Sequence, residues 1–199
     1  MSADEVLCEY DKNAVFYKNG GLTVTGGEPL LQIDFLLELF EKAKRKGIHT
    51  CIDTSGITYD VNDGEYLEKL DRLLYFTDLV MLDIKHIDQN KHKALTGYEN
   101  DGILDFAKYL DSKNIAIWIR HVVVEGYSDS DNDLVRLGEF IGSLRSVKAL
   151  DVIPYHTMGV AKYKKLGIRY RLEGVGALSK DSAIKAKQKI LEGIRKTRK

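Results

Sequence analysis

Five short apolar segments alternate with amphipathic helical patterns, and this alternation restricts the possible folds more than any other feature of the chain. The apolar segments are residues 20–25, 48–53, 79–85, 115–124 and 147–153. Helical patterns cover residues 2–18, 34–46, 65–74, 89–95, 103–110, 133–144 and the basic segment from Lys180. A strand-then-helix repeat of roughly thirty residues is typical of right-handed βαβ units. The sequence therefore predicts an α/β fold with a parallel sheet, followed by an irregular segment over residues 154–176.

Length and composition fit one domain that covers residues 1–199. The chain has 199 residues, 44% of them hydrophobic, which is enough for a substantial core. Lys and Arg together number 30, and so do Asp and Glu, so the net charge favours neither a nucleic acid nor an anionic membrane as a partner. No apolar run approaches the length of a membrane span, and the first residues do not resemble a signal peptide. Because the two cysteines, Cys8 and Cys51, are far apart, we expect a cytoplasmic protein.

The ends of all five predicted strands carry glycines or polar residues. Ligands of parallel sheets bind beyond the carboxyl ends of the strands, so these residues form a candidate site. They are Gly26, Gly27 and Glu28; Asp53 and Thr54; Asp83 and Lys85; Arg120 and Val122; and Pro154, Tyr155 and His156. Each group also has a structural explanation: a turn, a helix cap, a salt bridge or a hydrogen-bonded loop histidine. The presence of such a group at every strand end favours a binding site.

Several of these stretches resemble the motifs of one enzyme family. Residues 25–32 (TGGEPLLQ) resemble the glycine-glycine-glutamate motif of radical S-adenosylmethionine (SAM) enzymes, and residues 47–56 (GIHTCIDTSG) narrow this to activases of glycyl radical enzymes. Residues 78–85, 118–124 and 154–156 are similar to the activases that act on pyruvate formate-lyase. The likeness runs from about residue 14 to the C-terminus. It implies a partial parallel (β/α) barrel of the radical SAM type in which the first βα unit is missing.

The resemblance implies a set of SAM contacts. Gly27, beside Gly26, would hold the amino group of SAM through its main-chain oxygen, with help from Glu28. His156 would touch the nucleoside part, and Arg120 would contact SAM or the substrate peptide. The other SAM contacts that the resemblance implies are Asp83, Ile84, Lys85 and Val122.

The resemblance also implies a site for a monovalent cation, Na⁺ or K⁺, beside the SAM carboxylate. The ligands would be Asp53, Thr54, Asp83 and the carbonyl oxygen of Met81. A bound cation would offset the repulsion between two carboxylates that face one pocket.

The activity that the resemblance implies is reductive cleavage of SAM by a [4Fe-4S] cluster. The resulting 5′-deoxyadenosyl radical removes a hydrogen atom from a glycine of pyruvate formate-lyase, and the cofactors carry this chemistry. The expected partners are therefore that lyase and an electron donor such as flavodoxin or ferredoxin. No residue of the chain is assigned a catalytic role.

One part of the family pattern is missing from this sequence. The family holds its cluster with three cysteines spaced Cys-x-x-x-Cys-x-x-Cys upstream of the glycine-glycine-glutamate strand, and here Cys8 and Cys51 are the only thiols. We therefore expect that the polypeptide alone cannot assemble the cluster. It would be a truncated chain, which we favour, or one half of a split enzyme, or a protein that kept binding and lost the chemistry. Without a preceding strand, residues 20–25 would present an open sheet edge that favours dimerisation.

Three other functions stay open at this point. Lys85 at a strand end could be the nucleophile of a Schiff-base barrel enzyme. The chain could be a SAM- or lyase-binding module without catalysis, which would bind its lyase in the absence of iron. It could also be an activase of a different glycyl radical lyase. Many such relatives carry a ferredoxin-like insert before the glycine-glycine-glutamate strand, and residues 2–18 leave little room for one.

Overall fold

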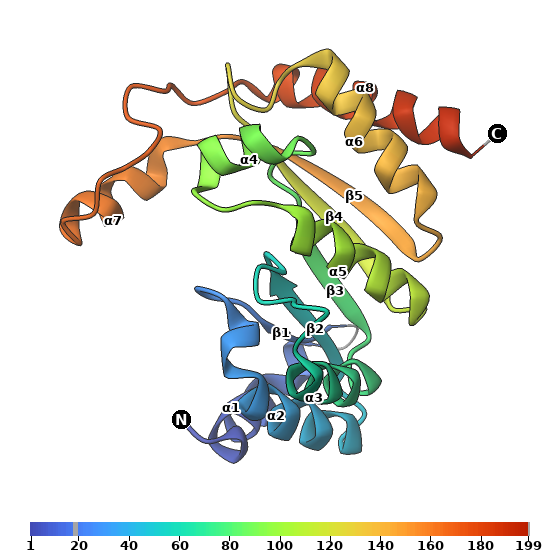
Figure 1. Cartoon of the computed structure of the whole chain (residues 1–199). Coiled ribbons are helices and arrows are strands. Elements are labelled where there is room, and N and C mark those ends of the chain that lie inside the picture. Colours follow the sequence, from blue (N-terminus) through green and yellow to red (C-terminus); the bar gives the residue numbers. More distant parts are fainter. Residues whose placement is uncertain (18–19, 199) are drawn as a thin grey trace.

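A computed structural model shows a parallel sheet in which the spatial order of the strands follows the sequence, β1-β2-β3-β4-β5 (Figure 1). The structure describes residues 1–17 and 20–198. The strands are β1 (Gly21–Val24), β2 (His49–Thr54), β3 (Leu79–Asp83), β4 (Ala116–Val123) and β5 (Val147–Pro154). Each neighbouring pair is parallel. The predicted α/β fold with a parallel sheet is confirmed, and all five predicted strands are present.

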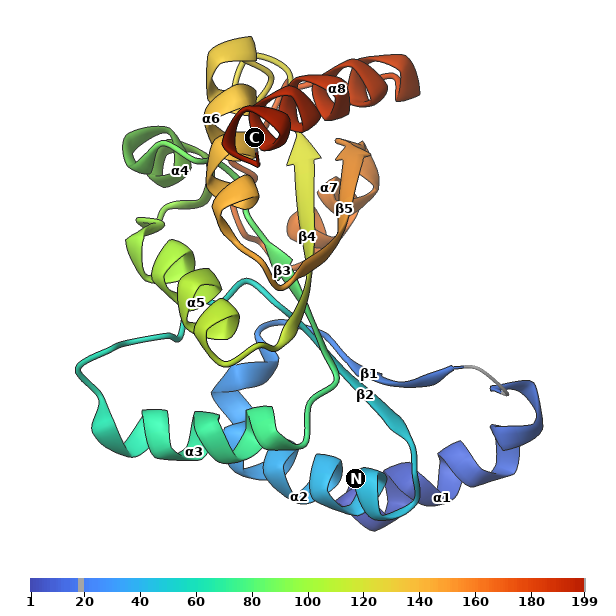
Figure 2. The same cartoon turned by 90° about the vertical axis from the view of Figure 1, so that its right-hand side faces the viewer.

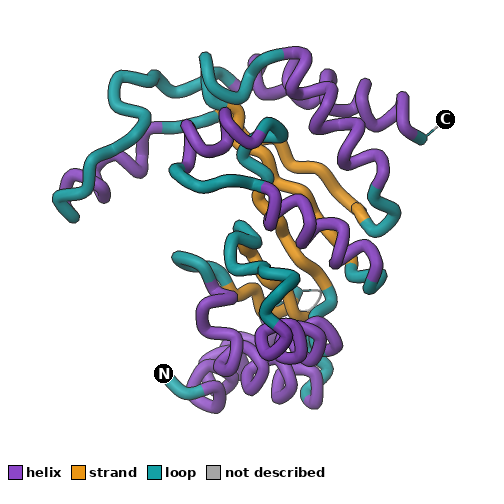
Figure 3. Tube along the Cα trace, viewed as in Figure 1, coloured by secondary structure: helices purple, strands orange, loops and turns teal. Residues whose placement is uncertain are grey.

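The helices lie around this sheet in chain order. They are α1 (Ala3–Asn13), α2 (Ile33–Arg45), α3 (Gly64–Tyr75), α4 (Gln89–Thr96), α5 (Asp101–Ser112), α6 (Asp131–Ser143), α7 (Val160–Lys165) and α8 (Lys180–Thr197), with short 3-10 helices η1 (Ala14–Phe16), η2 (Pro29–Gln32) and η3 (Thr157–Gly159). In Figure 1, α1, α2 and α3 lie below the sheet and α5, α6 and α8 lie to its right, while the segment with α7 extends to the left. Figure 2 shows the same arrangement after a quarter turn, and in Figure 3 the strands form one twisted layer.

Local sequence explains where the helices begin and which face they bury. Helix α1 starts at a capping box, in which the Ser2 and Glu5 side chains each accept a hydrogen bond from the other residue's backbone N–H. Helix α4 starts at Asp88, whose carboxylate accepts from two backbone N–H groups, and ends at Gly97 with a φ of 94°. The buried face of α2 follows helical spacing: Ile33, Leu36, Leu37, Leu39, Phe40 and Ala43. The apolar sides of the sheet and helices thus form one core.

Helices α6 and α8 cross at glycines, which lets their backbones come very close. A Cβ added to Gly138 would lie 2.0 Å from the carbonyl oxygen of Ile190, and one added to Gly193 would lie 2.1 Å from that of Val135. Real Cβ atoms do not approach backbone atoms so closely, so only glycine fits at these two positions. This crossing ties the C-terminal helix to the half of the sheet that holds β4 and β5.

The structure differs from the sequence-based expectations in a few boundaries. The third strand was expected to reach Lys85 but ends at Asp83, although the Ile84 N–H still donates to the Arg120 carbonyl at 3.0 Å. The irregular segment 154–176 contains η3 and α7. The helix expected over residues 2–18 ends at Asn13 and is followed by η1, and Lys18 lies outside the described residues.

Two further expectations concern the sheet edge and the membrane. Strand β1 pairs with β2 and occupies the end of the sheet order, so its other edge has no strand beside it in the described part of the chain. Dimerisation through that edge stays a prediction, as does the assignment of residues 1–199 to a single domain. Among the described residues, every helix is too short or too polar to span a bilayer.

Candidate functional site

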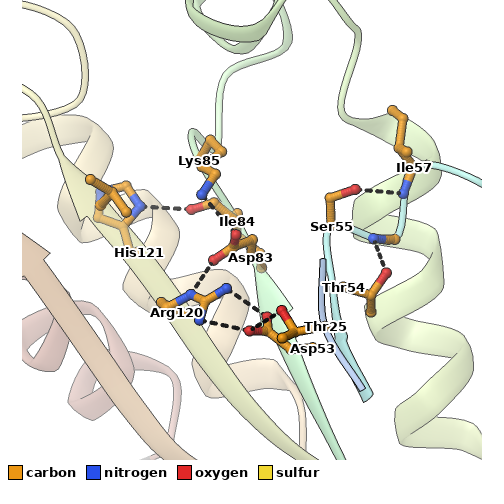
Figure 4. A network of polar contacts seen from close by, with 12 residues as sticks. Thr25, Asp53, Thr54, Ser55, Ile57, Asp83, Ile84, Lys85, Arg120 and His121 are labelled. Atoms are coloured by element: carbon orange, nitrogen blue, oxygen red, sulfur yellow. Dashed lines mark hydrogen bonds and ion pairs between the residues drawn. The ribbon is translucent and has the colours of Figure 1, made fainter. Parts of the chain in front are cut away.

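Two carboxylates and two cationic side chains meet where β2 and β3 end, beside the middle of β4 (Figure 4). Arg120 lies between the carboxylates: its Nη2 is 2.6 Å and its Nη1 3.1 Å from the Asp53 oxygens, and its Nε is 2.7 Å from Asp83. The second Asp83 oxygen accepts a hydrogen bond from Lys85 Nζ at 2.7 Å. Thr25, after β1, donates to Asp53 at 3.1 Å. Residues on or next to four neighbouring strands therefore form one network.

The parallel register brings these groups together. Asp83 and Arg120 are direct neighbours on β3 and β4, and Asp53 lies one strand further on β2, opposite Met81. The side chains of Asp53 and Asp83 are only 14% and 13% exposed, so the pairing with Arg120 is needed to offset their desolvation. With Lys85 included, the network holds two negative and two positive charges and is balanced.

The protonation states follow from this pairing. Burial by itself would raise the pKa of Asp83, but the hydrogen bond from Arg120 and the charge of Lys85 more than offset it, so the pKa lies below its ordinary value. The hydrogen bond to Asp83 raises the pKa of Arg120 still further above neutrality. Asp83 is therefore an anion and Arg120 a cation throughout the physiological pH range.

The glycine-glycine-glutamate turn after β1 is fixed by its glutamate. The Glu28 carboxylate accepts hydrogen bonds from Thr54 Oγ at 2.6 Å, from Ser55 Oγ at 2.6 Å and backbone N–H at 3.0 Å, and from the Leu30 N–H at 3.2 Å. Gly26 has a φ of 141°, which only glycine adopts readily. A Cβ at Gly26 or Gly27 would meet no atom within 4 Å, so the turn's backbone is open to an approaching molecule.

A cleft of about 780 Å³ lies over the ends of β3, β4 and β5. Its wall includes seven of the residues predicted at the strand ends: Asp83, Lys85, Arg120, Val122, Pro154, Tyr155 and His156. Apolar side chains of β4 and β5 and further aromatic rings line the rest, including Ile153 and Tyr163. This mixture of charged and apolar groups is typical of a site for a polar ligand with a flat apolar part.

Other predicted site residues lie elsewhere. The glycines and Glu28 are at the turn after β1, outside the cleft wall. The Ile84 side chain is fully buried, its N–H is bonded to Arg120 and its carbonyl accepts from His121, so it presents no free N–H to a ligand. Of the predicted cation ligands, Asp53 and Asp83 share the Arg120 guanidinium, whereas Thr54 Oγ donates to Glu28. In the part of the chain that the structure describes, no group of three or more His, Cys, Asp or Glu side chains could hold a metal ion.

The cysteines do not fit an iron–sulfur cluster. Cys8 is exposed on α1, and Cys51 is buried in β2. Burial raises the pKa of the Cys51 thiol and so disfavours the thiolate that a cluster requires. A [4Fe-4S] cluster takes three or four thiolates, and this chain has two cysteines on different elements.

Several residues of the cleft were missed by sequence reasoning. Tyr163, Ile168, Arg169, Tyr170 and Arg171 come from the segment that was expected to be irregular, and Leu95 and Thr96 come from α4. The alternation of basic and aromatic residues in that segment was a usable signal. Ser55, which gives Glu28 two of its hydrogen bonds, was also missed.

Comparisons with known proteins point to one family. Residues 1–138 match the sequence profile described as the radical SAM superfamily. The pyruvate formate-lyase-activating enzyme of Listeria monocytogenes is 50% identical over 193 residues, which are 96% of this chain and 77% of that protein. The enzyme of the same name from Staphylococcus aureus is 51% identical over 189 residues, 94% of this chain and 74% of that protein.

Solved structures show the same fold. A domain of pyruvate-formate lyase-activating enzyme from Bacteroides vulgatus superposes with a TM-score of 0.69 at 23% identity, covering 88% of this chain and 95% of that one. The radical SAM enzyme coproporphyrinogen III oxidase from Escherichia coli gives a TM-score of 0.55 at 13% identity, covering 98% of this chain and 46% of that one. The predicted partial (β/α) barrel of the radical SAM type is confirmed.

Proposed function

Because this chain belongs to the radical SAM superfamily, among the pyruvate formate-lyase-activating enzymes, we propose that it supplies the SAM-binding and substrate-binding machinery of a glycyl radical activase. In this proposal the substrate is pyruvate formate-lyase, the cofactors are SAM and a [4Fe-4S] cluster, and the electron donor is a protein such as flavodoxin or ferredoxin. The observation that carries the proposal is the charged network of Asp53, Asp83, Lys85 and Arg120 at the strand ends, beside the cleft.

The charges and shape of the cleft support SAM binding. The cations Lys85 and Arg120 suit the carboxylate of the methionine part, and the Asp83 anion suits its amino group. The apolar walls formed by Val122, Ile153 and neighbouring rings suit the adenine. The open backbone at Gly26 and Gly27 would let the turn reach a ligand directly. In this proposal the chain's own residues bind and orient SAM and exclude water from it.

A monovalent cation near Asp53 and Asp83 is part of the proposal. Both carboxylates are largely buried. Asp83 is paired with Arg120 and Lys85, whereas Asp53 is paired with Arg120 alone. If Arg120 turned toward a ligand or a substrate peptide, Asp53 would lose its counter-ion. Na⁺ or K⁺ would then restore the balance, with Met81 and Thr54 as further oxygen ligands.

The cluster does not belong to this binding machinery, because Cys8 and Cys51 do not fit one. No step of the reaction is therefore assigned to a cluster held by these residues. The same observation supports a second candidate function, a SAM- and lyase-binding module without catalysis. One experiment distinguishes the activase from the binding module. If a second polypeptide supplies the three cluster thiolates, the activase should form a glycyl radical on pyruvate formate-lyase, and the binding module should not.

A Schiff-base enzyme that uses Lys85 is disfavoured by the geometry. The Lys85 ammonium donates to Asp83 at 2.7 Å, and an ammonium held in an ion pair has no lone pair for attack on a carbonyl. A cytoplasmic location and the absence of nucleic-acid and membrane partners stay predictions from composition.

The test is calorimetric titration of SAM into the iron-free chain. We expect one SAM per chain, and Lys85→Met should weaken binding by about tenfold or more because a charge-assisted hydrogen bond is lost. Lys93→Met is the matched control, since Lys93 lies on α4 and pairs with the exposed Glu99. Equal affinity of the Lys85 and Lys93 variants would contradict the assigned role of the cleft.

A further inference from the structure

Residues 157–172, here called the arm, concentrate positive charge. The arm contains Lys162, Lys164, Lys165, Arg169 and Arg171. No acidic residue occurs between Asp151 and Glu173, although Lys and Arg equal Asp and Glu in the whole chain. Within residues 1–17 and 20–198, none of the five takes part in an ion pair. Their charges are therefore available to a partner.

The arm also exposes apolar side chains. Met158 is 77% exposed, Leu166 61%, Ile168 55% and Tyr163 41%, and residues 161–169 are exposed without interruption. A helix as short as α7 is marginal in water unless something packs on it. Clustered apolar side chains rimmed by charge are typical of interaction surfaces.

Specific contacts hold the base of the arm against the sheet. The hydroxyl of Tyr170 is hydrogen-bonded to that of Tyr155 at 2.7 Å, and the rings of Tyr163 and Tyr170 pack edge to face with centroids 4.9 Å apart. The Arg171 guanidinium lies against Gly97, where a Cβ would be 2.6 Å from Nη2. The tip with α7 extends away from the other elements (Figure 1). The arm is thus anchored at one end and open at the other.

The arm forms one wall of the functional cleft. Tyr163, Ile168 and Arg169 face the same space as Lys85 and Arg120. A macromolecule that covers the arm would therefore enter the cleft, next to the charged network. A basic surface that served only solubility would not need to lie beside the cleft, so this position indicates a binding role for the arm.

We propose that the arm docks the protein substrate, and that the docked surface of the substrate is acidic with at least one apolar side chain. This inference rests on the proposed activase function. Five unpaired cations favour an acidic partner, since complementary charge raises the association rate and fixes orientation. The concave shape beside the arm favours a protein segment over a flat membrane surface. The apolar side chains of the arm would form the centre of the interface, from which water is excluded on docking.

The experiment measures binding of iron-free chain to pyruvate formate-lyase by interferometry at two salt concentrations, with SAM binding measured in parallel. The test variant is Lys162→Glu/Lys164→Glu/Lys165→Glu, three exposed residues outside the cleft wall. The control is Lys180→Glu/Lys185→Glu/Lys187→Glu, three exposed lysines on α8 with the same change in charge. Anionic phosphatidylglycerol vesicles and an acidic flavodoxin serve as alternative probes.

We expect the arm variant to bind lyase about tenfold or more weakly at low salt, with the difference shrinking at high salt, while SAM affinity is unchanged. The control variant should bind lyase as the wild type does. Equal lyase binding by both variants would overturn the inference and leave the proposed function intact. The inference would also be overturned if the arm variant lost binding only to the vesicles or only to flavodoxin and still bound lyase as the wild type does. Wild-type chain that binds neither lyase nor SAM would overturn the proposed function as well.

Discussion

Arg120 is the residue on which the electrostatics of the site depend. It makes three hydrogen bonds to two largely buried carboxylates, Asp53 and Asp83, that come from different strands. Removal of the arginine would leave two buried carboxylates without this counter-ion. The resulting loss of stability is larger than the net stabilisation that the ion pairs contribute. Arg120 therefore positions the strand ends as well as offering a cation to a ligand.

Replacing Arg120 tests both this role and the proposed cation. Arg120→Ala should lower the free energy of unfolding by about 3 kcal/mol, because two carboxylates lose their counter-ion. Part of that loss should return when KCl or NaCl replaces tetramethylammonium chloride at equal ionic strength. Urea unfolding measures the effect, with Arg72→Ala as the control, since Arg72 is exposed on α3. A variant that is insensitive to the cation would argue against the cation site.

Three buried histidines near the site make stability depend on pH. His86, His92 and His121 are each about 2% exposed, and burial lowers the pKa of each below the ordinary value of 6.5. Each has a ring nitrogen without a hydrogen-bond partner in the described part of the chain. The folded chain therefore binds fewer protons than the unfolded chain, so the histidines' stabilising contribution is complete above pH 6.5 and is lost as the pH falls below it.

We expect the urea midpoint to fall between pH 7.5 and pH 5.5, within the range that begins at the ordinary histidine pKa. His92→Asn should reduce this dependence, because its amide keeps a donor for the Tyr98 carbonyl without titrating. The exposed His49, changed to Asn, is the control. A midpoint that is constant over this range, or a His92 variant as sensitive as the wild type, would contradict the reasoning.

At the scale of elements, the crossing of α6 and α8 is the most demanding contact of the fold. Gly193 lies against the backbone of Val135 and Glu139, which cannot move without shifting the whole helix. Helix α8 also packs against β5, and both helices contribute buried residues to the core. Because β5 pairs with β4, the position of α8 affects the strand that carries Arg120.

Gly193→Ala should lower the free energy of unfolding by about 1–3 kcal/mol, because overpacking outweighs the gain in helix propensity. Chemical denaturation with circular dichroism measures it. In the control Gly64→Ala, a Cβ at the start of α3 meets no atom within 4 Å, so stability should be unchanged or slightly higher. If both substitutions changed the free energy of unfolding equally little, the close approach of the α6 and α8 backbones would not exclude a Cβ at Gly193, and the prediction would be wrong.

Most elements could be predicted from the sequence because their patterns are local. Each strand is a run of apolar residues that the sheet buries, and α2 shows its buried face directly in the spacing of its apolar residues. Helix α7 was missed because its apolar side chains are exposed and its spacing reflects no buried face. The early end of β3 at Asp83 was missed because Ile84 continues the apolar run and still makes one backbone hydrogen bond to β4.

At the scale of the whole molecule, topology predicted which residues lie close together but not how their side chains pair. Strand order alone brings Asp53, Asp83 and Arg120 together, as expected for a parallel sheet. The Arg120 guanidinium binds both carboxylates because its side chain is long enough to extend across β3 to β2. The spacing of residues in the sequence does not predict this contact. The bond from Thr54 to Glu28 links two strand ends in the same non-local way.

The central claim is that this chain carries the binding machinery of an activase and does not itself hold the cluster. Anaerobic reconstitution of the chain with iron and sulfide, followed by iron analysis and EPR after reduction, tests it most directly. Because Cys8 and Cys51 lie on different elements and one is buried, we expect iron well below four atoms per chain and no signal that responds to SAM. A stoichiometric [4Fe-4S] signal that changes when SAM is added would contradict the claim.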